Sequence, residues 1–420
     1  MTRVRRLGRA TFSSLRNRNY RLYFIGQVIS VSGTWMQRLA QAWLILRLTH
    51  NNGVALGIES GLQFLPMLLF GAWGGVIADR VDKRRLMYCT QAAAGLLALG
   101  LGLIVAAGAA TVGIVYVFSV LLGFTNVFDN PARQTFVIEM VGRDELPNAV
   151  GLNSVVMNAS RVVGPAIGGI VIELVGLAPC FFLNAASFVA VIIALWMMHG
   201  EELHSVPTVP RAKGQLREGF RYMWSEKVVR TPLLMMAVIG TLAFNFQVII
   251  PLMSTGTFGL GAGGFGGLTA VMGVGAVLGG LAAASTRDVS YRRLLVLTFA
   301  MGVTICGAAI APTLLLEIVA LFCMGAASFA FIATANSTLQ LTSRPDMRGR
   351  VMAIYGIAFL GSTPVGAPII GWVCAQWGPR VGFAVGGVAT LLSGAAAWWS
   401  FARMRAERRR GVDGIAMRAA

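Results

Sequence analysis

Long apolar blocks alternate along the whole chain with short segments that are charged or contain glycine and proline. Each block has about 20 residues or more, the length that an α-helix needs to cross roughly 30 Å of hydrocarbon. This pattern predicts an all-α polytopic membrane protein with twelve transmembrane helices. The expected helices cover residues 20–47, 53–78, 86–107, 111–138, 148–174, 178–198, 231–253, 262–285, 292–311, 313–341, 350–373 and 379–401.

A polar stretch, residues 199–230, divides the twelve helices into two sets of six. It contains Pro207 and Pro210, followed by an amphipathic segment, Gln215–Trp224, that is expected to lie on the inner membrane surface. The predicted organisation is a basic cytoplasmic tail (1–19), an N-terminal six-helix bundle (20–198), a cytoplasmic linker (199–230), a C-terminal six-helix bundle (231–401) and a second basic cytoplasmic tail (402–420).

The two sets of helices resemble an internal repeat. Shifting Gly142–Gly169 by 202 positions places it on Arg344–Gly371 without a gap, and aligns Gly164 with Gly366. Each segment holds a charged turn followed by a helix that ends in a glycine and proline cluster. Two pseudo-symmetric six-helix bundles of this kind enclose a central cavity and can rock about it, which is the architecture of a transporter.

Composition agrees with a membrane location, since 56% of the 420 residues are hydrophobic and 12% are charged. A soluble domain has about 25% charged residues. The net charge of +18 could suggest nucleic-acid binding, but 30 of the 35 Lys and Arg residues lie in the two tails or in inter-helix segments on one side. Only Arg47 and Arg380 flank the opposite side. By the positive-inside rule both termini are cytoplasmic. The positive charge is therefore expected to set this orientation and to attract lipid headgroups, and no nucleic acid is expected as a partner.

The sequence lacks the patterns of several other kinds of chemistry. Its five cysteines are scattered in or beside apolar blocks, and its three histidines lie in loops, so neither a disulfide framework nor a metal site is expected. It has no G-x4-G-K-S/T motif and no clustered catalytic residues. The chain is therefore expected to be neither an ATPase nor any other enzyme, and to need no cofactor. The polar start, residues 1–20, differs from a cleaved signal peptide.

The turn between the second and third helices carries the run Gly75–Arg85, G-V-I-A-D-R-V-D-K-R-R. It resembles the G-x-L-A-D-R-x-G-R-K signature of the major facilitator superfamily, except that Asp82 replaces the usual glycine. In that family the motif latches the two halves together on the cytoplasmic side. The resemblance implies that Asp79 faces the positive N-terminal dipole of the eleventh helix, near Arg350, although these basic residues could serve topology alone. The implied conformational latch consists of Gly75, Asp79, Arg80, Lys83 and Arg84.

The fifth helix carries a second motif that resembles the family's antiporter signature, G-x8-G-x3-G-P-x-x-G-G. One glycine of the signature is replaced by serine. A proline bends a membrane helix and glycines admit a facing helix, so the motif could also be a generic kinked helix. The resemblance favours export over uptake. The matching residues are Gly151, Ser160, Gly164, Pro165, Gly168 and Gly169.

The stretch from Asp129 to Arg161 points to one branch of the superfamily. It is similar to the branch of the superfamily that contains enterobactin-type siderophore exporters, macrolide-type efflux proteins and lysophospholipid transporters. The resemblance covers nearly the whole chain, and the C-terminal half is the less distinctive part.

Ionisable side chains inside a membrane span are costly, so each is a candidate site residue. Arg38 and Arg161 would give a central cavity a positive potential suited to an anionic or polar ligand, although Arg161 could also be a clamp between helices. Asp129 and Arg133 are four residues apart on one helical face and could simply neutralise each other. The candidate cavity residues are Gln37, Arg38, Gln41, Glu59, Asp129, Arg133 and Arg161.

Export by proton exchange needs a carboxyl group that can take up a proton. Asp129 and Glu59 are the candidates, whereas Glu173 and Glu317 lie near helix ends and are expected to be solvated. The sequence thus predicts a secondary transporter that exports a drug, antibiotic, siderophore or similar small molecule by alternating access and proton antiport. It is expected to be a monomer in a bacterial cytoplasmic membrane. A lysophospholipid transporter, an importer and a non-transporting sensor are the alternatives.

Overall fold

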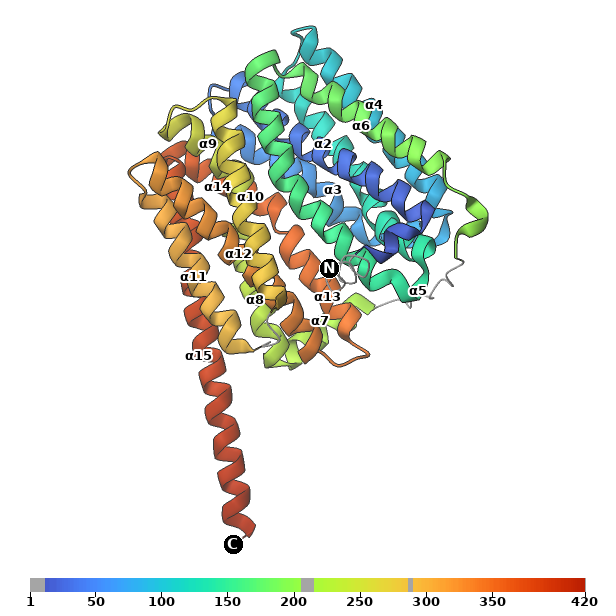
Figure 1. Cartoon of the computed structure of the whole chain (residues 1–420). Coiled ribbons are helices and arrows are strands. Elements are labelled where there is room, and N and C mark those ends of the chain that lie inside the picture. Colours follow the sequence, from blue (N-terminus) through green and yellow to red (C-terminus); the bar gives the residue numbers. More distant parts are fainter. Residues whose placement is uncertain (1–11, 205–214, 286–289, 420) are drawn as a thin grey trace, which may run out of the picture.

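The structure is a computed structural model that describes residues 12–204, 215–285 and 290–419, and every regular element in these ranges is helical. Figure 1 shows the helices packed side by side as two groups, one on either side of a central seam. The first group comprises η1 (Ser13–Arg16), α2 (Arg18–Leu48), α3 (Gly53–Arg80), α4 (Lys83–Ala106), α5 (Val112–Val175), α6 (Ala178–Trp196) and η2 (Gly200–Glu202). The second comprises α7 (Gln215–Ser225), α8 (Lys227–Leu242), α9 (Phe246–Leu252), η3 (Met253–Thr257), α10 (Ala262–Ser285), α11 (Tyr291–Ile310), α12 (Leu314–Thr342), α13 (Arg348–Leu360), α14 (Thr363–Trp377) and α15 (Pro379–Ala419).

Ten helical segments of the described chain are long and apolar enough to cross a membrane. Two of these segments consist of consecutive helices that together make one crossing, namely Lys227–Thr257 and Arg348–Trp377. The 64-residue α5 supplies two crossings, because Gly142 interrupts it with φ 72° and ψ −177°, a conformation open almost only to glycine. The charged turn expected between the fourth and fifth helices is thus a sharp reversal within one helical element.

The first predicted span, α2, is absent from those ten because its sequence is unusually polar. Gln27, Ser30, Gln37 and Gln41 are nevertheless buried. The three glutamines have side-chain partners on neighbouring helices of the same bundle, which replace water. With α2 counted and α5 counted twice, the helices are consistent with the twelve predicted spans.

The predicted repeat has a counterpart in helix packing. A Cβ on Gly164 of α5 would lie 2.6 Å from the carbonyl oxygen of Ser32 in the first span. At the matching position, a Cβ on Gly366 of α14 would lie 3.0 Å from the Cα of Thr241 in the seventh span. Only glycine allows these backbones to approach so closely, so the two halves use the same contact between their first and fifth helices.

The two halves meet at one end of the molecule. The basic end is defined here as the end that holds Arg80–Arg85, Gly142 and Arg344–Arg350, and the far end as the one that holds Thr49–Asn52, Gly176 and Gly378. At the far end α3 packs on α14, and α5 packs on α10, through glycines.

The same helices are separated at the basic end. α3 packs extensively on α14, which forms the far-end half of the eleventh span, but only slightly on α13, which forms its basic-end half. At the far end of the same helices Leu56 and Ala262 are buried. The described helices therefore form a structure that is closed at the far end and open at the basic end.

The expected amphipathic segment is present as α7, which packs on α13. Glu218 pairs with Arg350 at 2.8 Å, and the Tyr222 hydroxyl accepts a hydrogen bond from the backbone N–H of Arg344. Pro207 and Pro210 lie outside the described residues. The second tail is helical, since α15 continues to Ala419 and projects from the body of the molecule (Figure 1).

Candidate functional site

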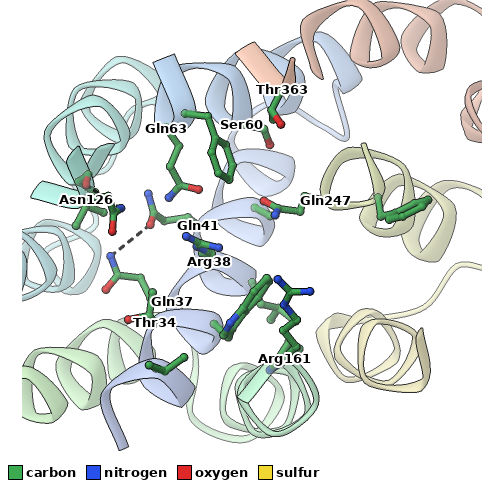
Figure 2. A pocket seen from close by; sticks show the side chains of 18 of the residues that line it. Thr34, Gln37, Arg38, Gln41, Ser60, Gln63, Asn126, Arg161, Gln247 and Thr363 are labelled. Carbon is green, nitrogen blue, oxygen red and sulfur yellow. Dashed lines mark hydrogen bonds between the residues drawn. The ribbon is translucent and has the colours of Figure 1, made fainter. Parts of the chain in front are cut away.

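A cavity of about 460 Å³ lies on the seam between the two halves. Its polar lining comes mainly from the first half, with Gln37, Arg38, Gln41 and Arg161 pointing into it (Figure 2). The second half contributes Gln247 and Thr363, together with several phenylalanines. One wall can therefore donate hydrogen bonds and carry charge, while the other is largely apolar and includes five phenylalanines besides the amides of Asn245 and Gln247. All seven cavity residues predicted from the sequence line it.

Two guanidinium groups share one indole ring in this cavity. The Arg38 Cζ lies 4.9 Å from the ring centroid of Trp35, and the Arg161 Cζ lies 5.2 Å from the same centroid. Arg161 also stacks on Phe329 of α12 at 4.6 Å, so it contacts both halves of the molecule. The Nε of Arg38 is buried and has no hydrogen-bond partner among the described residues. Stacking holds the two arginines in place without neutralising them.

Glu59 lies at the end of a hydrogen-bonded chain. Its Oε1 accepts a bond of 2.8 Å from Ser119 of α5, whose hydroxyl oxygen accepts from Gln41 at 3.2 Å. Gln37 donates to Gln41, and Asn184 of α6 donates to Gln37 at 2.6 Å. Every donor in this chain points towards the carboxyl group. Glu59 is buried, and within the described chain no Lys or Arg nitrogen lies at ion-pair distance from it.

Asp129 has quite different surroundings. Its Oδ2 forms an ion pair with Arg133 one turn later in α5. Its Oδ1 accepts hydrogen bonds from Thr90 at 2.8 Å and Gln91 at 2.7 Å, both from α4. Arg133 also donates to Gln27 of α2 at 3.0 Å. The pair thus neutralises itself and joins α2, α4 and α5, which agrees with the structural alternative derived from its spacing.

Two basic residues of the predicted latch, Lys83 and Arg84, make contacts within the first half. Lys83 pairs with Glu139 of α5 at 2.7 Å. Arg84 donates to the carbonyl oxygen of Leu195 at the end of α6. Gly75 is buried and Arg80 is exposed. Asp82, the departure from the signature, caps α4 by accepting a bond from the backbone N–H of Arg85 at 2.7 Å.

Most of the antiporter-like motif lies at helix contacts. The Ser160 hydroxyl lies 3.0 Å from that of Ser32, and a Cβ on Gly168 would lie 3.1 Å from the Met36 side chain of α2. Gly169 faces α10, where its Cβ would lie 2.8 Å from the carbonyl oxygen of Ala262. Gly151 is different, because a Cβ there would have open space. Pro165 keeps helical geometry, so the interruption of α5 is at Gly142.

Several site residues were not predicted. Trp35 and Phe329 hold the arginines, and Ser119 and Asn184 complete the chain to Glu59. Trp35 lies one turn before Arg38, and Asn184 is a polar residue in an apolar span, so both had a sequence signal. The prediction for Glu317 was wrong. Its side chain is fully buried and neither oxygen has a hydrogen-bond partner among the described residues, although Leu315 and Leu316 in the same first turn of α12 are exposed.

Comparison with known proteins agrees with the architecture. The structure resembles the crystal structure of a bacterial homolog to the human lysosomal transporter Spinster in an inward-facing and unoccupied conformation. The TM-score is 0.68 at 15% sequence identity, with 91% of this chain and 95% of that one covered. This likeness concerns the fold.

Three curated relatives are named as transporters. The staphyloferrin A transporter of Staphylococcus aureus is 27% identical over 56% of this chain, and the match spans 59% of that protein. The enterobactin exporter EntS of Shigella boydii is 23% identical, with 89% of this chain and 90% of that protein covered. The multidrug efflux pump Tap of Mycolicibacterium fortuitum is 26% identical, with 87% and 91% covered.

Residues 9–411 match the family described as transmembrane secretion effector. With the helical architecture and the central cavity, this match over nearly the whole chain establishes a multi-pass membrane transporter of small molecules and not an enzyme. The chain belongs to the transmembrane secretion effector family of the major facilitator superfamily.

Proposed function

We propose that this protein exports a small organic molecule from the cytoplasm by alternating access. The observation that carries the proposal is the cavity on the seam, which is sealed at the far end and open at the basic end. The positive-inside rule assigns the basic end and both termini to the cytoplasm. In this orientation the cavity can load substrate from the cytoplasm. The relatives named as an enterobactin exporter and a multidrug efflux pump support export.

Release on the other side requires the glycine contacts at the far end to separate and the basic end to close. α3 with α14, and α5 with α10, are the helix pairs on which the halves would turn. Gly75–Arg84 would act as a latch in the closed state. The contacts of Lys83 and Arg84 within the first half already fix the turn against α5 and α6.

The proposed counter-ion is a proton, and Glu59 is the proposed carrier. Asp129 is held by an arginine and two hydrogen-bond donors, whereas Glu59 is partnered mainly by a hydroxyl group and lines the cavity. A carboxyl group must lose and regain a proton during each cycle. The environment of Glu59 lets it do so without breaking an ion pair.

The test uses inside-out membrane vesicles energised with a proton gradient and a pH-sensitive dye. Antibiotics, siderophores and lysophospholipids are added in turn, and proton release from the lumen is followed. Wild-type protein should give a response to at least one class, Glu59→Gln should abolish it, and Glu201→Gln, at an exposed residue, should retain it. A response that survives Glu59→Gln would refute the role of Glu59. Uptake in place of export would refute the direction.

One observation favours lysophospholipid as a second candidate substrate. An apolar groove of about 620 Å³ between α4 and α5 shares Thr90 and Thr125 with the central cavity. Leu96, Leu121 and Phe124 line it and are exposed along the membrane-spanning part of these helices. A substrate with an acyl chain could use this groove. A dye response confined to the lysophospholipids of the panel would favour this candidate over drugs and siderophores.

A further inference from the structure

We propose that the substrates of this transporter are amphipathic organic anions, held by Arg38 and Arg161 around Trp35 with the apolar part of the molecule against the phenylalanine wall. The proposal rests on the export function proposed above, since it assigns a substrate class to the same cavity. It concerns the chemistry of the bound molecule and is independent of how export is driven.

The first step of the argument is the state of the two guanidinium groups. Each lies within about 5 Å of the Trp35 centroid, at 4.9 Å and 5.2 Å, so the two Cζ atoms are separated by at most the sum of these distances, 10.1 Å. Within the described chain, no carboxylate oxygen lies within 4.0 Å of either group. Two like charges so close together repel each other in a medium of low dielectric constant. An aromatic ring orients them but supplies no negative charge.

The second step is the charge of the whole cavity. Three arginines and two acidic residues line it. Arg133 and Asp129 neutralise each other through their ion pair, which leaves Arg38 and Arg161 opposite Glu59 alone. The cavity therefore has an excess of one positive charge when Glu59 is ionised and of two when it is protonated. A bound anion supplies the missing charge, and a planar carboxylate matches the fork of donors on a guanidinium group.

The third step is the opposite wall. The second half contributes Phe244, Phe246, Phe265, Phe329 and Phe359 to the cavity lining. Phe244 and Phe359 lie edge to face at 5.3 Å, and Trp43 stacks with Phe265 at 6.4 Å. A fully hydrated inorganic anion would gain nothing from these rings. A molecule that carries an aromatic or other apolar group beside its carboxylate would bury that group against them.

A cationic drug is a poor fit for the same site. It would need a carboxylate partner, and Glu59 is the remaining candidate after Asp129 is paired. That partner shares the cavity with two uncompensated guanidinium groups, which would repel the drug. The alternative for Arg161 is a purely structural clamp between the halves, through its contact with Phe329. The two roles of Arg161, anion binding and a structural clamp, predict different results when its charge is removed. Only the first predicts a selective loss of affinity for anions.

The experiment measures equilibrium binding of two probes of similar shape to purified protein in detergent. The probes are naphthalene-2,6-dicarboxylate and its neutral analogue, naphthalene-2,6-dicarboxamide. Wild-type protein should bind the dicarboxylate at least about tenfold more tightly than the diamide. Arg38→Gln and Arg161→Gln should each weaken dicarboxylate binding about tenfold or more and change diamide binding by less than about twofold. The control Arg47→Gln, at an exposed position of the same helix as Arg38, should change neither.

Three results would overturn the proposal: equal affinity of wild-type protein for both probes, no binding of either probe at millimolar concentration, or an unchanged preference in both arginine variants. The comparison of the two probes on wild-type protein needs no variant, so a variant that fails to fold does not remove the test. Glu59→Gln should keep the preference for the dicarboxylate even where it abolishes the dye response.

The outcomes separate this proposal from the export function. Selective binding of the dicarboxylate with no dye response to any compound would support the anion site and refute proton-coupled export. A dye response to neutral or cationic compounds, with equal affinity for the two probes, would refute the anion site and support export.

Discussion

Gly169 of α5 and Gly266 of α10 lie in contact across the seam, where a Cβ on Gly169 would be 3.1 Å from the Cα of Gly266. A second contact across the seam joins Gly371 of α14 to Gly57 of α3. A Cβ on Gly371 would be 3.0 Å from the Cα of Gly57. The two contacts occupy equivalent places in the two halves. Together they close the far end through backbone atoms, so this closure depends on the absence of side chains.

We expect Gly169→Leu to open the far end. The leucine would collide with the backbone of α10, and overpacking of this kind costs about 1–3 kcal/mol. That energy corresponds to a roughly 5- to 150-fold shift of a two-state equilibrium. The export rate should fall, because less of the protein would be closed at the far end. Spin labels would be attached at Ala109→Cys and Gly261→Cys in a protein whose exposed Cys89 and Cys323 are replaced by serine. The distance between the two labels should increase in Gly169→Leu.

Gly151→Leu is the matched control for this prediction. It places the same side chain on the same element, where a Cβ meets open space. It should leave the distance distribution and export close to those of the wild type. If Gly169→Leu and Gly151→Leu gave the same distribution, the contact with α10 would not determine closure.

Ser119→Ala should destabilise the protein, whereas Ser328→Ala should not. Ser119 donates to Glu59 and accepts from Gln41, so its removal leaves two buried groups without a partner. Ser328 is equally buried, but its hydroxyl has no hydrogen-bond partner among the described residues. Hydrogen bonds between membrane helices contribute about 1 kcal/mol. Thermal unfolding in detergent should show a lower midpoint for Ser119→Ala and an unchanged or higher midpoint for Ser328→Ala.

Asp129→Asn should be more damaging than the loss of both charges together. Removal of one member of a buried ion pair typically costs about 3–5 kcal/mol, because the other charge remains buried without a partner. In Asp129→Asn that charge belongs to Arg133. The double variant Asp129→Asn/Arg133→Gln should therefore recover part of the stability lost in the single variant. A double-mutant cycle on unfolding free energies measures this coupling, and additive effects would contradict it.

Gly142→Ala should destabilise the reversal within α5. The backbone at Gly142 has φ 72° and ψ −177°, and a side chain there costs about 1–3 kcal/mol. Gly151→Ala, in the helical part of the same element, should instead stabilise by about 0.5–1 kcal/mol, because alanine favours a helix more than glycine does. Unfolding midpoints of the two variants should move in opposite directions.

The fold was largely predictable because membrane spans are determined by local composition. The expected ranges 262–285 and 313–341 agree with α10 and α12 to within a residue. The charged turn expected between the fourth and fifth helices is present at Gly142, but helical hydrogen bonding continues on both sides of it, and the polar residues there gave no sign of this. The positive φ of one glycine is a property of the backbone that a single sequence does not reveal.

The candidate cavity residues were also found from the sequence, because an ionisable group in an apolar span is conspicuous. Their partners were not. Asp129 and Glu59 looked equivalent along the chain, and only the positions of Thr90, Gln91 and Ser119 on neighbouring helices distinguish an ion pair from a carboxyl group with a hydroxyl partner. Glu317 was judged by its nearness to a helix end, whereas its burial depends on how α12 is seated among its neighbours.

The uncompensated charge of Arg38 and Arg161 also bears on the energy source of the transporter. An organic anion taken from the cytoplasm at these residues and released at the far end travels from the negative to the positive side of an energised membrane. The membrane potential contributes about 2.3 kcal/mol per charge for every 100 mV. This corresponds to a roughly 50-fold concentration ratio. In the proposed exchange an entering proton would move charge in the same direction, so each cycle would be electrogenic and voltage would drive both steps.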